Sequence, residues 1–145
     1  MTTTLRIAKT LLLLLLIVPF ALAQSAEKTL VKSFAFEKNE TVTLDLPGTV
    51  ALQTWDSPLL RVQISIMLNN GSEAVLKSLI SAGRYNLTTE NKDGQTFIIA
   101  PAMDKTVRIG GKPLEDTVRF LVFAPDNLSV KIKTPTDNST MGKAF

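Results

Sequence analysis

Residues 41–69 read TVTLDLPGTVALQTWDSPLLRVQISIMLN, and this stretch decides the fold class of the chain. Apolar and polar side chains alternate in three runs, at residues 42–46, 50–52 and 62–68. A period of two is typical of a β-strand with one face in a core and the other in water. The runs are interrupted by the sequences PG and WDSP, whose residue types favour tight turns. We therefore expect three strands joined by two turns, forming the sheet on which the rest of the chain packs.

Further alternating runs on both sides of this stretch extend the β pattern. Strand patterns occur at residues 30–36, 85–90, 95–100, 117–124 and 128–132, and a short edge strand is expected around residues 107–109. The sequence FII at residues 97–99 is apolar on both faces, which favours an interior position in a sheet. Residues 24–29 are polar, and we expect them to be a frayed lead-in.

One helix is expected between the strands. Ser72 is a residue type that caps helix N-termini, and Glu73 would follow it near the positive end of the helix dipole. Apolar residues then recur at helical spacing, namely Val75, Leu76, Leu79 and Ile80. Gly83 stands where a C-terminal cap belongs. A helix of about ten residues is marginal alone in water, so its apolar stripe must lie on the sheet.

Two segments share a pattern of apolar strand, Pro-containing turn and a second strand of the form V-x-[LI]-x-T. They are LDLPGTVALQT at residues 44–54 and VFAPDNLSVKIKT at residues 122–134. Repeated strand–turn–strand units are typical of stacked rungs in a β-solenoid, whereas two unrelated hairpins suit a sandwich-like body. We therefore predict an all-β fold, mainly β with one helix, built as a short β-solenoid or β-roll or as a sandwich-like body.

The N-terminal segment predicts export. Arg6 and Lys9 precede an apolar run at residues 11–22, and Ala21 and Ala23 supply the small residues of an A-x-A cleavage site. This combination is that of a secretory signal peptide. The apolar run would form a helix of only about 18 Å, shorter than the ~30 Å hydrocarbon core of a membrane. A cleaved signal peptide is therefore favoured over a membrane anchor.

Cleavage after Ala23 divides the chain into three expected parts. These are a signal peptide at residues 1–23, a single β domain at residues 24–134 and a disordered tail at residues 135–145. The mature protein is expected in the periplasm or outside the cell, with no membrane span after cleavage. The chain has no cysteine, so packing and backbone pairing alone must hold an exported fold together.

The charge balance gives no indication of a nucleic-acid partner. The chain has 16 Lys and Arg against 13 Asp and Glu, a net charge of +3. Arg6 and Lys9 belong to the predicted signal peptide, which leaves 14 basic against 13 acidic residues in the mature chain. Nucleic-acid binding usually needs a clustered basic face. We therefore expect no nucleic-acid partner.

The residue types exclude several kinds of catalysis. The chain has no His and no Cys, which excludes Ser-His-Asp and Cys-His arrangements and zinc sites built on these ligands. Glycoside hydrolysis by two carboxylates remains an alternative, and it needs two acids in one cleft. The candidate acids all fall at predicted turns or wet faces: Asp45, Asp56, Glu115, Asp116 and Asp126. We expect no catalytic site, no metal and no cofactor.

Trp55 and Asp56 are the residues singled out for contact with a partner or ligand. Trp55 is the only tryptophan, and in an exposed turn it would stack on a sugar ring or anchor a protein partner. The alternative is that Trp55 folds back over the sheet, with its indole N–H donating to a carbonyl. Asp56 is expected to cap the turn by accepting from backbone N–H groups two residues further on.

A resemblance to a known family supports export and a β body. The segments PGTVALQTWDSPLLRVQISI at residues 47–66 and LVFAPDNLSVKIKT at residues 121–134 resemble a Bacteroidetes-type family of exported, adhesin-like β-repeat envelope proteins of unknown function. The sharpest matches are Val50, Thr54, Trp55, Asp56 and Val62. The resemblance implies a β-solenoid or β-roll-like body, and it identifies no ligand-binding residue. The helix and the small number of rungs depart from this pattern and leave a compact sandwich-like body as the alternative.

These observations favour an exported, non-catalytic structural or adhesin-like β module of the bacterial cell envelope. Its expected partners are envelope proteins or a second copy of the chain, bound through an unpaired sheet edge. The alternative is a soluble periplasmic protein that binds a glycan or a lipid near Trp55. A hydrolase with two carboxylates is the third hypothesis.

Overall fold

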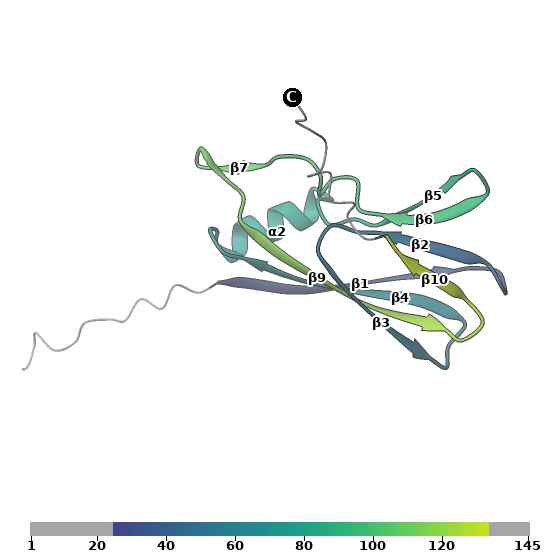
Figure 1. Cartoon of the computed structure of the whole chain (residues 1–145). Coiled ribbons are helices and arrows are strands. Elements are labelled where there is room, and N and C mark those ends of the chain that lie inside the picture. Colours follow the sequence, from purple (N-terminus) through teal and green to yellow (C-terminus); the bar gives the residue numbers. More distant parts are fainter. Residues whose placement is uncertain (1–24, 134–145) are drawn as a thin grey trace, which may run out of the picture.

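The computed structural model describes residues 25–133, which form two four-stranded sheets, a two-stranded hairpin and one α-helix (Figure 1). The elements in chain order are β1 (Ala26–Ala35), β2 (Thr41–Asp45), β3 (Thr49–Trp55), β4 (Leu59–Leu68), α2 (Glu73–Ser81), β5 (Thr88–Lys92), β6 (Gln95–Ile99), β7 (Arg108–Ile109), β8 (Lys112–Pro113), β9 (Asp116–Pro125) and β10 (Ser129–Ile132). The predicted all-β class with one helix is confirmed. The predicted signal peptide at residues 1–23 and the predicted tail at residues 135–145 lie outside the described residues.

Sheet A has the strand order β1-β4-β9-β3. The pairs β1–β4 and β4–β9 are antiparallel, whereas β3 runs parallel to β9. The central strands bury every second residue, as the alternation in the sequence predicts. The buried row of β4 is Leu60, Val62, Ile64, Ile66 and Leu68, and that of β9 is Val118, Phe120, Val122 and Ala124.

Sheet B has the strand order β10-β2-β6-β5. β2 runs parallel to both of its neighbours, and β5 pairs with β6 as an antiparallel hairpin. Val42 and Leu44 of β2 and Ile98 of β6 are fully buried. The interior position predicted for the FII sequence is confirmed, because β6 lies between β2 and β5.

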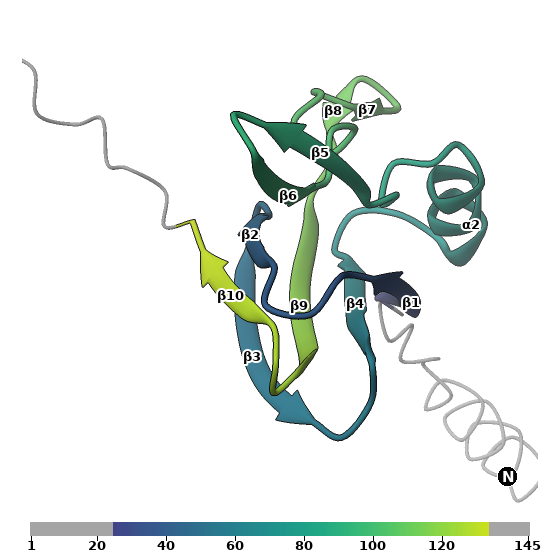
Figure 2. The ribbon, with the colours of Figure 1, turned by 90° about the vertical axis from the view of Figure 1, so that its right-hand side faces the viewer.

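The two sheets face each other, and their inner faces share one hydrophobic core (Figure 2). The molecule is therefore a β-sandwich. Helix α2 packs against β1, on the side of sheet A that faces sheet B. Leu76 of α2 is buried in the same core, and Val75, Leu79 and Ile80 pack against it half-buried. The helix thus covers the part of the inner face of sheet A near β1.

The ends of α2 agree with the prediction. Ser72 is the N-cap, and its Oγ accepts a hydrogen bond from the backbone N–H of Val75 at 3.4 Å. Glu73 lies in the first turn. The helix ends at Ser81, Ala82 is the C-cap, and Gly83 follows with a positive φ of 80°. This sequence of conformations is the usual glycine termination of a helix.

The prediction of one sheet made from residues 41–69 is wrong. The three strands exist, but β2 belongs to sheet B, while β3 and β4 belong to sheet A. Even β3 and β4 do not pair, because β9 lies between them. The two turns therefore connect strands that are not neighbours. Each of these strands forms its ladder hydrogen bonds with strands from more distant segments of the chain.

The echo between residues 44–54 and 122–134 does not produce stacked rungs. In stacked rungs, the first strands of the two units would pair with each other, as would the second strands. Here β2 pairs with β10 and β3 pairs with β9, so the first strand of each unit pairs with the second strand of the other. The structure therefore has the sandwich-like body and not the solenoid.

Two element boundaries differ from the prediction. β1 begins at Ala26, so residues 26–29 of the predicted frayed lead-in at residues 24–29 belong to a strand: the ladder to β4 pairs Ala26 with Leu68. The strand predicted from residue 85 starts only at Thr88. Tyr85 and Leu87 lie before it and are buried in the core. Their alternating apolar pattern thus reflects burial in a loop.

The turn between β2 and β3 carries the chain from sheet B to sheet A, and it depends on Gly48. Gly48 has a φ of +122°, and an added Cβ would lie 2.7 Å from the carbonyl oxygen of Val118. A side chain here would strain the backbone and would also collide with β9.

We expect Gly48→Ala to lower the free energy of unfolding by about 2–4 kcal/mol, because it combines backbone strain with a backbone collision. Gly94→Ala is the matched control. Gly94 also has a positive φ, of +74°, but nothing lies within 4 Å of the added Cβ, so a loss of about 1 kcal/mol is expected. Urea unfolding followed by circular dichroism measures both. Equal losses would show that the close approach to β9 is unimportant.

Candidate functional site

The edges of the two sheets are the first candidate for contact with a partner. Sheet A ends at β1 and β3, and sheet B ends at β10 and β5. An edge strand presents unpaired N–H and C=O groups that can pair with another chain, and charged side chains on the edge oppose such pairing. The four edge strands are therefore best compared by the charges that they carry.

Three of the four edge strands carry charged residues, and the fourth does not. The charged residues are Glu27, Lys28 and Lys32 on β1, Glu90 and Lys92 on β5, and Lys131 on β10. β3 reads TVALQTW and has neither a charge nor a proline. Thr and Val also favour the extended conformation. β3 is thus the unguarded edge of the described sandwich.

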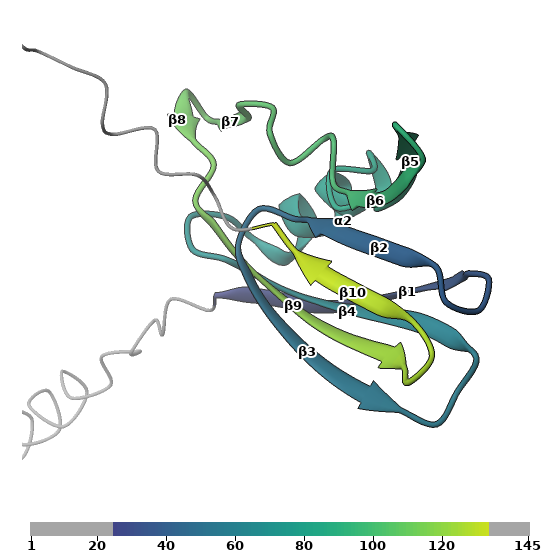
Figure 3. The same ribbon diagram turned by 45° about the vertical axis from the view of Figure 1, so that its right-hand side comes forward.

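The exposure of β3 agrees with this position. Five of its seven residues are exposed, and Val50 and Trp55 are half-buried. Leu52 keeps 39% of its surface exposed, which makes it one of the few exposed large apolar residues in the described chain. Figure 3 shows β3 at the rim of sheet A, beside β9 and with no further strand beyond it.

Trp55 ends β3 on the outer face of sheet A, away from sheet B. Its indole lies 5.5 Å from the ring of Phe123 on β9, and the Arg61 guanidinium on β4 lies 4.6 Å from the indole centroid. The indole Nε1–H donates to the carbonyl of Leu59 at 2.8 Å. Trp55 therefore folds back over the sheet, as the second of the two interpretations predicted.

Asp56 does not cap its turn as predicted. The side-chain hydrogen bond in this turn comes from Ser57, whose Oγ accepts from the N–H of Leu59 at 3.5 Å. Asp56 is exposed and lines a shallow hollow of about 330 Å³ together with Trp55. The other lining residues are Ser57, Pro58, Pro125, Asp126 and Asn127. The structure thus places both predicted contact residues on one hollow.

The hollow also brings together two of the acids considered for hydrolysis, Asp56 and Asp126. Both residues are exposed. Glycoside hydrolysis uses an acid held in a desolvated pocket beside a second carboxylate, which this open position does not supply. The hollow combines an aromatic edge with carboxylate, amide and hydroxyl groups, a set that suits hydrogen bonding to a polyol surface better than proton transfer.

A larger hollow of about 520 Å³ lies where β2 and β6 end. It contains Asp45, whose carboxylate pairs with the Lys133 ammonium at 2.6 Å. Glu90 and Asp104 also line it. Among residues 25–133, no group of three or more acidic side chains is placed to hold a metal ion. Asp45 is therefore occupied in a surface ion pair.

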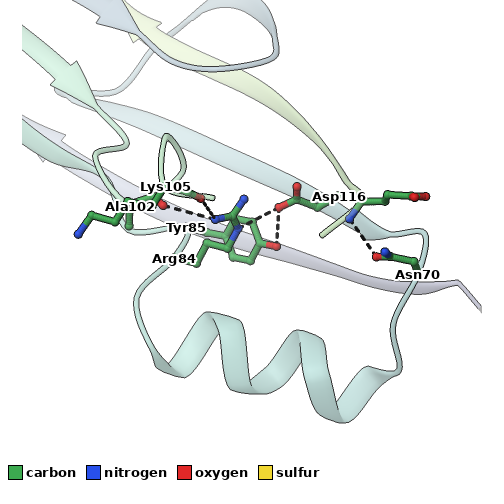
Figure 4. Close-up of polar contacts among 7 residues, drawn as sticks. Asn70, Arg84, Tyr85, Ala102, Lys105 and Asp116 are labelled. Carbon is green, nitrogen blue, oxygen red and sulfur yellow. Dashed lines mark hydrogen bonds and ion pairs between the residues drawn. The ribbon is translucent and has the colours of Figure 1, made fainter. Parts of the chain in front are cut away.

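A network of polar contacts, some of them part-buried, links the loops around α2 (Figure 4). Asp116 accepts from Arg84 Nε at 3.1 Å and from the Tyr85 hydroxyl at 2.9 Å. Arg84 also donates through Nη1 to the carbonyls of Lys105 and Ala102. These bonds tie the loop after α2 to the start of β9 and to the 100–105 loop.

Asn70 completes the same connection from the loop before α2. Its Oδ1 accepts from the N–H of Glu115 (Figure 4). Its Nδ2 donates to the carbonyl of Pro113. Every one of these groups contacts protein, and the Arg84 and Asp116 side chains are only 10% and 13% exposed. The network therefore holds the helix and its loops to β9 and does not form an open site.

Sequence reasoning found Trp55 and Asp56 but missed Leu52, Phe123 and Arg61. The absence of charge in TVALQTW is visible in the sequence. However, the absence of charge indicates a contact surface only when β3 is known to be an edge strand. Phe123 and Arg61 come from two other strands, so only their register with β3 places them beside Trp55.

Burial in the first place, and the hydrogen bond to Asp116 in the second, raise the pKa of the Tyr85 hydroxyl above its usual value near 10. The folded state then holds the phenol proton more tightly than the unfolded chain does. This contribution to stability is complete below about pH 10 and is lost as the pH rises above that value.

We expect wild type to lose about 2 kcal/mol more stability than Tyr85→Phe between pH 9 and about pH 11.5, because the variant has no phenol to ionise. At pH 8, the variant should be about 1 kcal/mol less stable, since Asp116 loses a hydrogen bond. Urea unfolding across this pH range measures both effects. Parallel pH profiles for the two proteins would contradict the role of Tyr85.

Comparison with known proteins gives no family assignment. No family model matches the chain, and no curated protein matches it. Among the described residues, no helix has the length and apolar character that crossing a membrane requires. The candidate site therefore rests on the edge strand β3 and on the outer-face cluster of Trp55, Phe123 and Arg61 beside it.

Proposed function

We propose that the protein is an exported, non-catalytic structural or adhesin-like module of the bacterial cell envelope. It acts through protein–protein contact at the β3 edge of sheet A. The observation that carries this proposal is the contrast among the edges: β3 alone among the four edge strands of the described sandwich has no charge. The signal-peptide features of residues 1–23 and the resemblance of residues 47–66 to adhesin-like envelope proteins support the location.

The mechanism is addition of a strand to the sheet. Alternate residues of β3 direct their backbone groups to β9, and the others direct them outward. An extended segment of a partner can pair with these outward groups, which gives affinity without any deep pocket. Exposed Leu52 and the half-buried Trp55 flank this ladder and would contact side chains of the added strand.

A photo-crosslinking amino acid at Gln53 tests this function in living bacteria. Gln53 lies on β3, and Thr29 on the charged edge β1 is the matched control, since both residues are exposed. We expect the mature chain in the periplasmic or extracellular fraction, and several-fold more protein adducts from position 53 than from position 29.

Adducts with another envelope protein and adducts with the chain itself both support contact at the β3 edge. Equal yields from the two positions, or no adduct from position 53, would contradict contact at the β3 edge. A chain that stays in the cytoplasm would contradict the envelope location independently.

Glycan binding is a second candidate function, favoured by the hollow at the end of β3. Trp55, Asp56, Asp126 and Asn127 line it. An aromatic edge beside carboxylate and amide groups suits a sugar, which packs against the edge and hydrogen-bonds through its hydroxyls. For a lipid, the apolar crevice beside Leu30 and Ile80 has only about 240 Å³, below the ~300 Å³ of ordinary ligand pockets.

Trp55 is the only tryptophan, so its fluorescence reports directly on the hollow. If a glycan binds there, titration with cell-wall oligosaccharides should give a saturable shift that Asp126→Ala abolishes. Asp104→Ala, in the other hollow, should leave the shift unchanged. No shift with any saccharide, or an equal effect of both variants, would reject this function.

A further inference from the structure

We propose that the partner of the β3 edge is β3 of a second copy, paired antiparallel about a twofold axis at Leu52. This inference rests on the proposed function and specifies its partner. It would join the two copies of sheet A into one continuous sheet. The argument combines the sequence of β3, the exposed apolar side chains near it and the charges on the other edges.

The sequence TVALQTW is self-complementary in this register. Leu52 meets Leu52 of the second copy at the axis, Val50 meets Thr54, and Thr49 meets Trp55. These combinations of aliphatic, β-branched and aromatic residues are favourable across antiparallel strands. Because β3 has no charged residue, the pairing places no two like charges opposite each other.

The open side of the sandwich beside β3 exposes a second apolar side chain. β10 ends sheet B on the same side as β3 ends sheet A (Figure 2). Ile132 of β10 pairs with buried Leu44 and so occupies an inward-facing position, yet 43% of its surface is exposed. Leu52 pairs with buried Val122 and is 39% exposed in the same way. A second copy at this side would cover apolar surface as well as pair backbone groups.

The charges on the other edges favour a closed pair over a growing chain. If β3 paired with β1, β5 or β10 of the next copy, every copy would keep one free edge and the assembly would extend without limit. Lys28, Lys32, Lys92 and Lys131 oppose such pairings. Pairing of β3 with β3 consumes the unguarded edge of both copies, so the assembly stops at two.

The contact should be weak. One strand pair between two small sandwiches is a small interface, below the roughly 1,200 Å² at which specific complexes become stable. We therefore expect a monomer–dimer equilibrium that depends on protein concentration, with affinity raised where the chain is confined at a surface.

Sedimentation velocity of the mature chain over a range of concentrations tests the equilibrium. Wild type should shift from monomer to dimer and no further. Leu52→Lys should abolish the shift, and Val31→Lys, which places the same charge on exposed Val31 of β1, should keep it. Thr54→Lys is the second β3 variant, at an exposed position, and should also abolish the shift.

Single cysteines test the register, because the natural chain has none. Oxidation should link Leu52→Cys into a dimer readily, since this residue lies opposite itself at the axis. Val50→Cys and Thr54→Cys should link poorly alone and well when mixed. Val31→Cys should give only background dimer.

A monomer at all concentrations, a dimer that Leu52→Lys leaves intact, or equal oxidation of the cysteines at positions 31 and 52 would each overturn the twofold pairing. If one of these results is found and position 53 nevertheless crosslinks to a different envelope protein in cells, the proposed function stands and only this inference falls. Growth beyond the dimer would likewise overturn it, because the charged edges would then be pairing.

Discussion

The structure depends on the position of β9 between β4 and β3. β9 pairs antiparallel with β4 and parallel with β3, and its buried row includes Phe120 and Val122 at the centre of the core. A parallel pair requires a long crossover. The chain between β3 and β9 supplies it with β4, α2 and the strands β5 to β8. Because β9 lies next to β4, β3 is left at the edge of sheet A. This edge is the candidate interaction surface.

Local interactions made part of this fold predictable. The alternation at residues 62–68 is a property of one strand, and the Ser72 cap and Gly83 termination are properties of one helix. Each is set by neighbours within a few residues, so the sequence shows it directly. The same holds for β6, whose apolar residues on both faces indicated an interior position before its neighbours were known.

Strand order was not predictable, because it depends on contacts between distant segments. The tight turn at Gly48 suggested a hairpin, yet it connects two different sheets, since the backbone there must pass close to Val118 of β9. The candidate site was not predictable for the same reason. Trp55 was identified from its residue type, whereas its partners Phe123 and Arg61 are 68 and 6 residues away and meet it only through the register of three strands.

An uncharged edge favours association of this chain, because residues 24–145 have 14 basic and 13 acidic residues and a small net charge gives little mutual repulsion between copies. Repulsion must then come from charges placed on particular strands. β1, β5 and β10 have such charges and β3 does not. The distribution restricts pairing to one edge without preventing it. A sandwich with charges on three of its four edges can add one strand at the fourth edge, and the charged edges oppose growth into fibres.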